Sequence, residues 1–130
     1  MYRLTNVFAI LLALTMLAPA TIDVDASDKP LYTAQVKKAR AYLKTKMNRR
    51  QFVCLHKLWW NESRWKVRAK NKYSGAYGIP QALPGRKMRK YGKHWRTRAM
   101  IQVKWGYHYV KVRYGTPCNA LRFQYYRGWY

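Results

Sequence analysis

Acidic side chains are almost absent from this sequence of 130 residues. Four occur against 27 lysines and arginines, and three of them, Asp23, Asp25 and Asp28, lie near the N-terminus. Glu62 is therefore the single carboxylate side chain from Lys29 onward. That part of the chain lacks the two facing carboxylates that most glycoside hydrolases use. If it carries out carboxylate chemistry, Glu62 must perform it.

Long apolar runs are lacking as well, apart from the stretch 7–17, which only Thr15 interrupts. A positive start precedes this run and small residues follow it, which is typical of a secretory signal peptide in residues 1–26 with cleavage after Ala20 or Ala26. The run is shorter than the roughly 20 apolar residues of a membrane span, although an uncleaved anchor is the alternative. We therefore expect a secreted, periplasmic or cell-wall-associated protein with no transmembrane segment in its mature form.

Cysteine and histidine are scarce. In an oxidising compartment an even pair such as Cys54 and Cys118 favours a disulfide, which would stabilise the fold by roughly 4 kcal/mol. The three histidines are scattered, with no second histidine or cysteine at metal-ligand spacing. We interpret them as surface or packing residues and predict no metal and no cofactor.

Positive charge dominates what is present. Without residues 1–28 the formal net charge rises from +23 to +25. Such a surface attracts polyanions, including nucleic acid, anionic lipid and charged cell-wall polymers. A coat that serves only solubility usually mixes both signs, so the charge favours an anionic partner or environment.

Apolar spacing predicts a mainly α-helical fold, with no repeat and no convincing strand. The segment 27–50 is basic and amphipathic, and it either packs on the domain or lies on a membrane surface. A domain of residues 51–130 follows it. We expect helices over residues 30–50, 51–60, 97–114 and 118–126, and a short turn over 86–91.

The helix over 97–114 has Thr97 as its expected N-cap and Gly115 as its stop. Gly106 in its middle costs about 1 kcal/mol relative to alanine, so we expect it to permit a close approach. The predicted buried positions of this helix are Ile101, Trp105, His108 or Tyr109, and Val112.

Glu62 falls at or just past the end of the helix predicted over 51–60. One interpretation is structural, a helical pair with Lys66 worth a few tenths of a kcal/mol. The other is chemical, because burial beside Trp59 and Trp65 would raise the pKa of Glu62, whereas cationic surroundings would lower it. The segment 67–84 that follows is unusually long for a connecting loop in a small domain, which favours a functional role.

Several short motifs follow one another along the chain in an order that resembles the transglycosylase SLT-like domain of lysozyme-like fold, found in secreted actinobacterial proteins and in phages. The resemblance covers residues 52–130. It rests on Leu58-Trp59-x-x-Glu62-Ser63-x-Trp65, Ser74-Gly75-Ala76-Tyr77-Gly78-Ile79-Pro80-Gln81-Ala82-Leu83-Pro84, Gln102-x-x-Trp105-Gly106-x-x-Tyr109 and Gly128-Trp129-Tyr130. The excess positive charge and the segment 119–124 depart from the family pattern.

The resemblance implies a small lysozyme-like helical domain that cleaves peptidoglycan strands between N-acetylmuramic acid and N-acetylglucosamine. Glu62 would be the general acid and base, and Ser63 would hold or polarise it. The Cys54–Cys118 pair matches positions that secreted relatives often bridge. The implied substrate-binding residues are Ser63, Ser74, Tyr77, Gly78, Ile79, Gln81 and Tyr109, with Gln81 on the floor of a cleft walled by residues 77–79.

The single carboxylate favours a lytic transglycosylase over a hydrolytic muramidase, because the sugar's own 6-hydroxyl can replace a second carboxylate and water. A different class of function remains open. A secreted cationic protein could bind anionic envelope polymers, or nucleic acid without sequence specificity, with Glu62 in a structural role only.

Overall fold

The structure is a computed structural model that describes residues 33–130. Its regular elements are all helical, and two isolated β-bridges, Lys70 with Tyr77 and Tyr77 with Ala82, are the extended pairings reported within this range. The prediction of a mainly α-helical fold is thus confirmed. The elements are α1 (Ala34–Lys44), α2 (Arg49–Ser63), the 3-10 helix η2 (Gly85–Tyr91), α3 (Ala99–Tyr114) and α4 (Pro117–Arg127).

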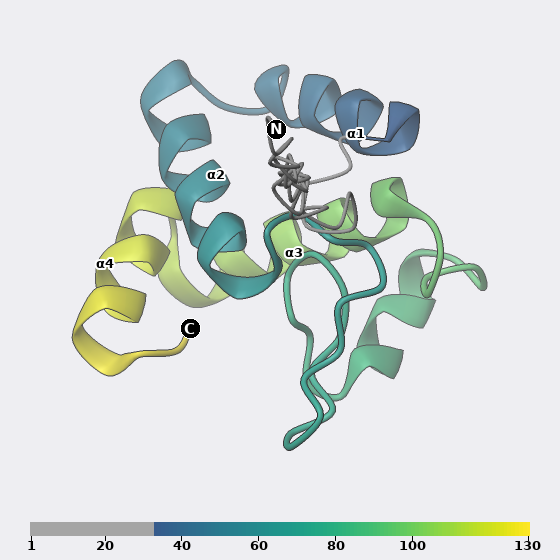
Figure 1. Ribbon diagram of the computed structural model, residues 1–130. Coiled ribbons are helices and arrows are strands. Elements are labelled where there is room, and N and C mark those ends of the chain that lie inside the picture. Colours follow the sequence, from purple (N-terminus) through teal and green to yellow (C-terminus); the bar gives the residue numbers. More distant parts are fainter. Residues whose placement is uncertain (1–32) are drawn as a thin grey trace, which may run out of the picture.

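Helix α3 occupies the middle of the molecule (Figure 1). It contacts α1, α4 and η2, while α2 packs chiefly against α4. The long loop that follows α2 extends away from the helices, and the C-terminus returns to lie near α2. A core of fully buried side chains joins the first three α-helices, and its members include Leu43, Leu55, Leu58, Val103 and Val110.

The boundary between the first two helices differs from the prediction of one helix over 30–50. Helix α1 ends at Lys44, and a turn leads to Asn48, whose side chain accepts a hydrogen bond from the Gln51 backbone N–H at 3.0 Å. Asparagine is a favoured N-cap, so the chain starts a new helix at Arg49. Apolar residues at helical spacing are buried in both helices: Val36, Ala39 and Leu43 on α1, and Phe52, Leu55, Leu58 and Trp59 on α2.

The predicted buried face of α3 is partly wrong. Trp105 is buried, and Ile101 and Tyr109, the alternative to the exposed His108, are partly buried, but Val112 is 73% exposed. The residues that do face the core recur at intervals of three and four, with Trp105 beside them: Ala99, Gln102, Val103, Gly106 and Val110. Because this face includes a glutamine and a glycine, a search for apolar spacing places the buried face on the neighbouring side of the helix.

The ends of α3 also refine the prediction. Arg98, not Thr97, is the N-cap residue; its own side chain makes no capping bond, and the Ala99 N–H donates instead to the side-chain oxygen of Gln35 on α1 at 3.0 Å. The predicted stop at Gly115 is confirmed, with φ at +76°. The close approach expected at Gly106 is confirmed too, because a Cβ there would lie 2.7 Å from Trp59 Cζ2 and 2.8 Å from Pro80 Cβ.

The Cys54–Cys118 disulfide is present, as predicted. Cys54 lies in the middle of α2 and Cys118 in the first turn of α4, at a sequence separation of 64. The bridge therefore joins the helix that carries Glu62 to the last helix.

The predicted signal peptide and the three N-terminal aspartates lie outside the described residues. From residue 33 onward the basic segment forms α1, which packs on α3 and α2 and shares their core. None of the helices within residues 33–130 is long and apolar enough to cross a membrane.

Candidate functional site

Glu62 lies in the last turn of α2, which ends at the next residue, Ser63. Arg64 adopts a left-handed conformation with φ of 51°, and its N–H donates to the Trp60 carbonyl oxygen at 2.9 Å. Trp65 follows, also with positive φ, and turns its side chain into the core. The suggested helical pairing of Glu62 with Lys66 is therefore wrong, because α2 does not continue that far.

The carboxylate of Glu62 is half-buried and has a defined partner. Gln124 of α4 donates a hydrogen bond from its side-chain amide to Glu62 Oε1, and its own amide oxygen accepts one from Asn61 Nδ2 at 2.9 Å. Since each end of the Gln124 amide is used, its orientation is set, and its N–H group points at Glu62. The side chain of Gln124 thus presents a neutral donor to the carboxylate.

Burial decides the ionisation of Glu62. Desolvation raises the pKa of its carboxyl group, and the hydrogen bond from Gln124 lowers it by a smaller amount. Of the two opposing effects considered from the sequence, burial is the stronger. The group therefore stays protonated to a higher pH than an exposed glutamate does.

A second side chain at this site comes from the C-terminal residue, Tyr130. Its hydroxyl accepts a hydrogen bond from Trp59 Nε1 at 2.8 Å and donates one to the Pro80 carbonyl oxygen at 2.8 Å. Burial raises the pKa of Tyr130 well above its usual value, and the negative charge of Glu62 raises it further. The phenol therefore remains neutral and joins the C-terminal segment to α2 and to the long loop.

Ser63 is directed toward the loop. Its buried hydroxyl donates to the carbonyl oxygen of Ile79 at 2.8 Å, and the Trp59 carbonyl oxygen lies 3.2 Å from the same hydroxyl oxygen. Ile79 is fully buried. Ser63 thus joins the loop to the end of α2, at the residue that follows Glu62. This contact differs from the suggested role of holding or polarising the Glu62 carboxylate.

Gln102 of α3 holds the other side of the same loop. Its amide oxygen accepts from the Ile79 N–H at 2.8 Å, and its amide nitrogen donates to the carbonyl oxygens of Val67 at 2.8 Å and Trp95 at 2.9 Å. A Cβ at Gly78 would lie 2.5 Å from Gln102 Oε1, and the φ of Gly78 is +76°. Only glycine suits this position. The backbone of residues 77–79, which was predicted to line a cleft, therefore packs directly against the buried side chain of Gln102.

The side chains of the remaining predicted loop residues form hydrogen bonds with backbone groups of the loop or of the segment before α3. Gln81 donates from its amide to the Gly78 carbonyl oxygen at 2.9 Å, and Tyr77 donates from its hydroxyl to the Arg96 carbonyl oxygen at 3.0 Å. Ser74 is exposed, and its hydroxyl accepts from the Ala76 N–H at 3.2 Å. These bonds shape the loop, and none of them reaches Glu62.

Two hollows are connected to the Glu62 network through neighbouring side chains, and Glu62 itself lines neither of them. One, of about 360 Å³, includes Trp105 and Tyr109, whose rings stack with centroids 5.2 Å apart. Tyr109 also packs on Tyr130 with ring centroids 5.9 Å apart, which connects this hollow to the site. The other, of about 470 Å³, includes Trp60 and Asn61, the residues just before Glu62 in sequence.

Gln124 and Tyr130 were not among the residues predicted for the site. A signal for Gln124 is present in the sequence, because it is a polar residue on the same helical face as Ala120 and Leu121, which are buried. Buried polar groups require partners, so a glutamine at that position indicates a specific contact. Tyr130 belongs to the Gly128-Trp129-Tyr130 motif of the resemblance, to which no role at the site was assigned.

Within residues 33–130 no group of three or more potential metal ligands occurs. His94 and His108 are exposed, and His56 packs on Trp65 with ring centroids 5.8 Å apart, in agreement with the prediction of surface or packing histidines. In comparisons with known proteins, no family model, no curated protein and no solved structure matches this chain.

Proposed function

We propose that this protein cleaves the bond between N-acetylmuramic acid and N-acetylglucosamine in peptidoglycan, with Glu62 as acid and base. The observation that carries the proposal is the state of Glu62, a lone half-buried carboxylate with a raised pKa and a neutral amide partner. A carboxyl group that keeps its proton can deliver it to a glycosidic oxygen. The motif resemblance around Glu62 and residues 74–84 supports the choice of substrate.

The chemistry needs only one carboxylate. Glu62 protonates the glycosidic oxygen while the bond from that oxygen to C1 of the muramic acid breaks. The 6-hydroxyl oxygen of the same sugar then attacks C1, and its proton passes to the Glu62 carboxylate. The product carries a 1,6-anhydro ring, no water is consumed and Glu62 is regenerated.

The surroundings of Glu62 suit a sugar chain. Aromatic rings can pack on the apolar faces of sugars, and such rings line the hollows at Trp60 and at Tyr109. In this proposal the glycan strand packs on these rings while its glycosidic oxygen reaches Glu62. Ser63 and Gln102 would then act indirectly by keeping the loop in place.

The test compares the wild-type protein with Glu62→Gln on purified cell walls. We expect clearing of turbidity by the wild-type protein, anhydro-ended fragments by mass spectrometry, and neither with Glu62→Gln. Arg50→Gln, at the opposite end of α2, is the matched control and should clear walls normally, with circular dichroism as the check on folding. Clearing at the wild-type rate by folded Glu62→Gln would end the enzymatic proposal.

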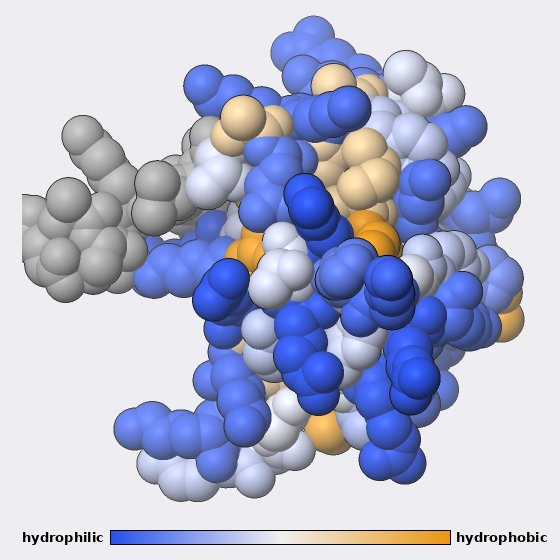
Figure 2. All heavy atoms as spheres, turned by 90° about the vertical axis from the view of Figure 1, so that its right-hand side faces the viewer, coloured by the Kyte–Doolittle hydropathy of each residue, from blue (hydrophilic) through white to orange (hydrophobic). Residues whose placement is uncertain are grey.

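A second candidate is binding without catalysis. It is favoured by the charge, since Figure 2 shows a face covered mainly by hydrophilic side chains with only scattered hydrophobic ones. In that case the wild-type protein would bind walls or DNA as strongly as Glu62→Gln does and release no fragments. A gel-shift assay with DNA beside zymography on peptidoglycan separates the two candidates.

A further inference from the structure

A shallow groove lies where three elements meet, on the side of α3 that carries Lys104 and Lys111. It has a volume of about 540 Å³. Tyr42 comes from α1, Lys90 and Tyr91 come from η2, and the remaining lining residues, including Tyr107, come from α3. We refer to this surface, defined by Lys90, Lys104, Lys111, Tyr42, Tyr91 and Tyr107, as the lysine groove.

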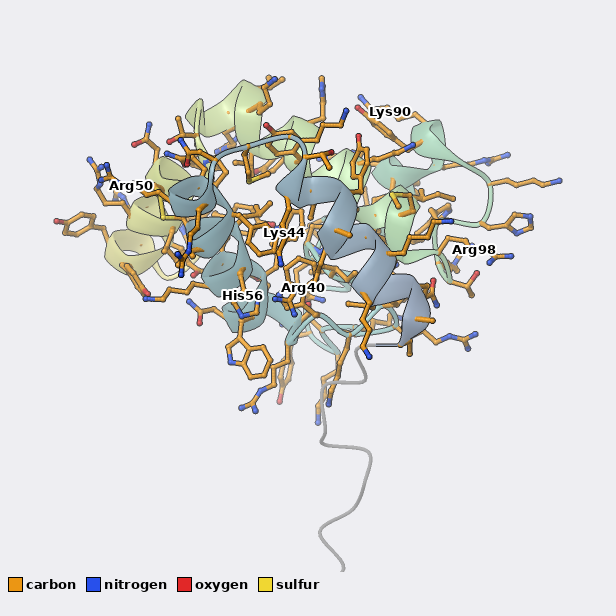
Figure 3. The ribbon with its side chains drawn as sticks, turned by 90° about the horizontal axis from the view of Figure 1, so that it is seen from above. Arg40, Lys44, Arg50, His56, Lys90 and Arg98 are labelled. Atoms are coloured by element: carbon orange, nitrogen blue, oxygen red, sulfur yellow. A yellow bond between two sulfur atoms is a disulfide. The ribbon has the colours of Figure 1, made fainter. Side chains whose placement is uncertain are left out.

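The lysine groove is distinct from the region between α1 and α2. Figure 3 shows Lys90 near the edge of the molecule on the η2 side of α1, whereas Arg40 and His56 lie between α1 and α2. Glu62 is the only acidic side chain among the described residues, and it accepts a hydrogen bond from Gln124 on α4. No acidic side chain of residues 33–130 therefore lines the groove to balance its lysines.

Each lysine of the groove lies over a tyrosine ring. Lys104 Nζ is 5.4 Å from the centroid of Tyr42, Lys111 Nζ is 5.6 Å from that of Tyr107, and Lys90 Nζ is 5.8 Å from that of Tyr91. Cation–π contacts of this kind hold an ammonium group near the ring face. The groove thus concentrates three positive charges in defined places on elements that are packed together.

We propose that the lysine groove binds a polyphosphodiester chain, a linear polymer with one negative charge per repeat. Lysine ammonium groups bind phosphate as compact point charges, and the groove contains no arginine that could stack on a base. Binding of single-stranded nucleic acid relies on open aromatic faces. Here the ammonium groups lie over those faces, so the groove favours phosphate without a base.

The lysine groove adjoins the hollow that contains Tyr109. Lys90 and His108 line both the lysine groove and the hollow that contains Tyr109. A polyphosphodiester held in the groove would therefore lie beside the surface proposed for the glycan. Glu62 takes no part in this contact, so the site does not depend on the proposed function.

The test uses fluorescently labelled poly(glycerol phosphate) and full-length protein that carries Glu62→Gln. The groove variant combines Lys90→Gln, Lys104→Gln and Lys111→Gln. The matched control combines Lys37→Gln, Lys70→Gln and Lys72→Gln, which remove the same charge from exposed positions elsewhere. Fluorescence anisotropy measures affinity over a salt series, and circular dichroism checks that both variants fold.

We expect the groove variant to bind at least tenfold more weakly than the control variant at one salt concentration. Equal loss of affinity in the two variants would overturn the proposal, because the attraction would then be spread over the whole surface. No binding by the parent protein would overturn it as well. An oligo(dT) with the same number of phosphates forms the third arm. Tighter groove-dependent binding of oligo(dT) than of poly(glycerol phosphate) would identify nucleic acid as the ligand and reject the polymer proposed here.

Discussion

Gln124 of α4 donates a hydrogen bond to the carboxylate of Glu62 on α2, across 62 positions of sequence. The two helices are also joined by the Cys54–Cys118 disulfide and form the most extensive helix contact of the described residues. The position of the single carboxylate is therefore set by how α4 packs on α2. Burial in the same region raises the pKa of its carboxyl group.

Cleavage should depend on pH through the raised pKa of Glu62. The protonated form is the acid, so kcat/KM should fall as pH rises through that pKa. Because burial raises it, the falling limb should lie above the ordinary glutamate value of 4.5. Rates on a soluble glycan over a pH series, at constant ionic strength, measure the limb. A falling limb at or below the ordinary value would contradict the effect of burial.

Gln124→Leu should slow cleavage about tenfold, which corresponds to about 1.4 kcal/mol for a lost hydrogen bond to the reacting group. The bond from Gln124 lowers the pKa of Glu62, so its loss should also move the falling limb of the pH profile to higher pH. Arg122→Ala, at an exposed position of the same helix, is the control and should leave both quantities unchanged. A slower variant with an unmoved pH profile would mean that Gln124 acts on packing alone.

Gly106→Ala should destabilise the fold by about 1–3 kcal/mol, because the new methyl group has no room beside Trp59 and Pro80. In an open helix the same change would stabilise by about 1 kcal/mol. Urea unfolding followed by tryptophan fluorescence gives the difference in free energy of unfolding. Lys111→Ala on an exposed face of α3 serves as the control, and any net stabilisation by Gly106→Ala would disprove the close packing.

Loss of the disulfide should be costly. Changing Cys54 and Cys118 together to serine opens a loop of 64 residues and should lower the free energy of unfolding by about 4 kcal/mol. Urea unfolding of the double variant measures this loss. Thiol labelling of denatured, unreduced wild-type protein should find no free thiol, whereas two reactive thiols would show that the bridge does not form.

The spacing of apolar residues in the sequence was sufficient to predict the helices and the buried faces of α1 and α2. Val36, Ala39 and Leu43 repeat at helical spacing and are buried on α1, and the same holds for the apolar stripe of α2. The pattern failed at Lys44, where a turn leads to the Asn48 cap, and on α3, whose buried face includes Gln102 and Gly106. Apolar spacing does not register a face that contains a buried polar residue and a glycine.

The sequence by itself determined that Glu62 is the one carboxylate after residue 28, that two cysteines are available to pair, and that the chain is strongly basic. Only the tertiary structure decided what surrounds Glu62. Gln124 and Tyr130 reach the end of α2 from the last helix and the C-terminus, and Ser63 turns to the loop. Residue types can be read along the chain, whereas burial and the partners of a polar group depend on contacts between segments distant in sequence.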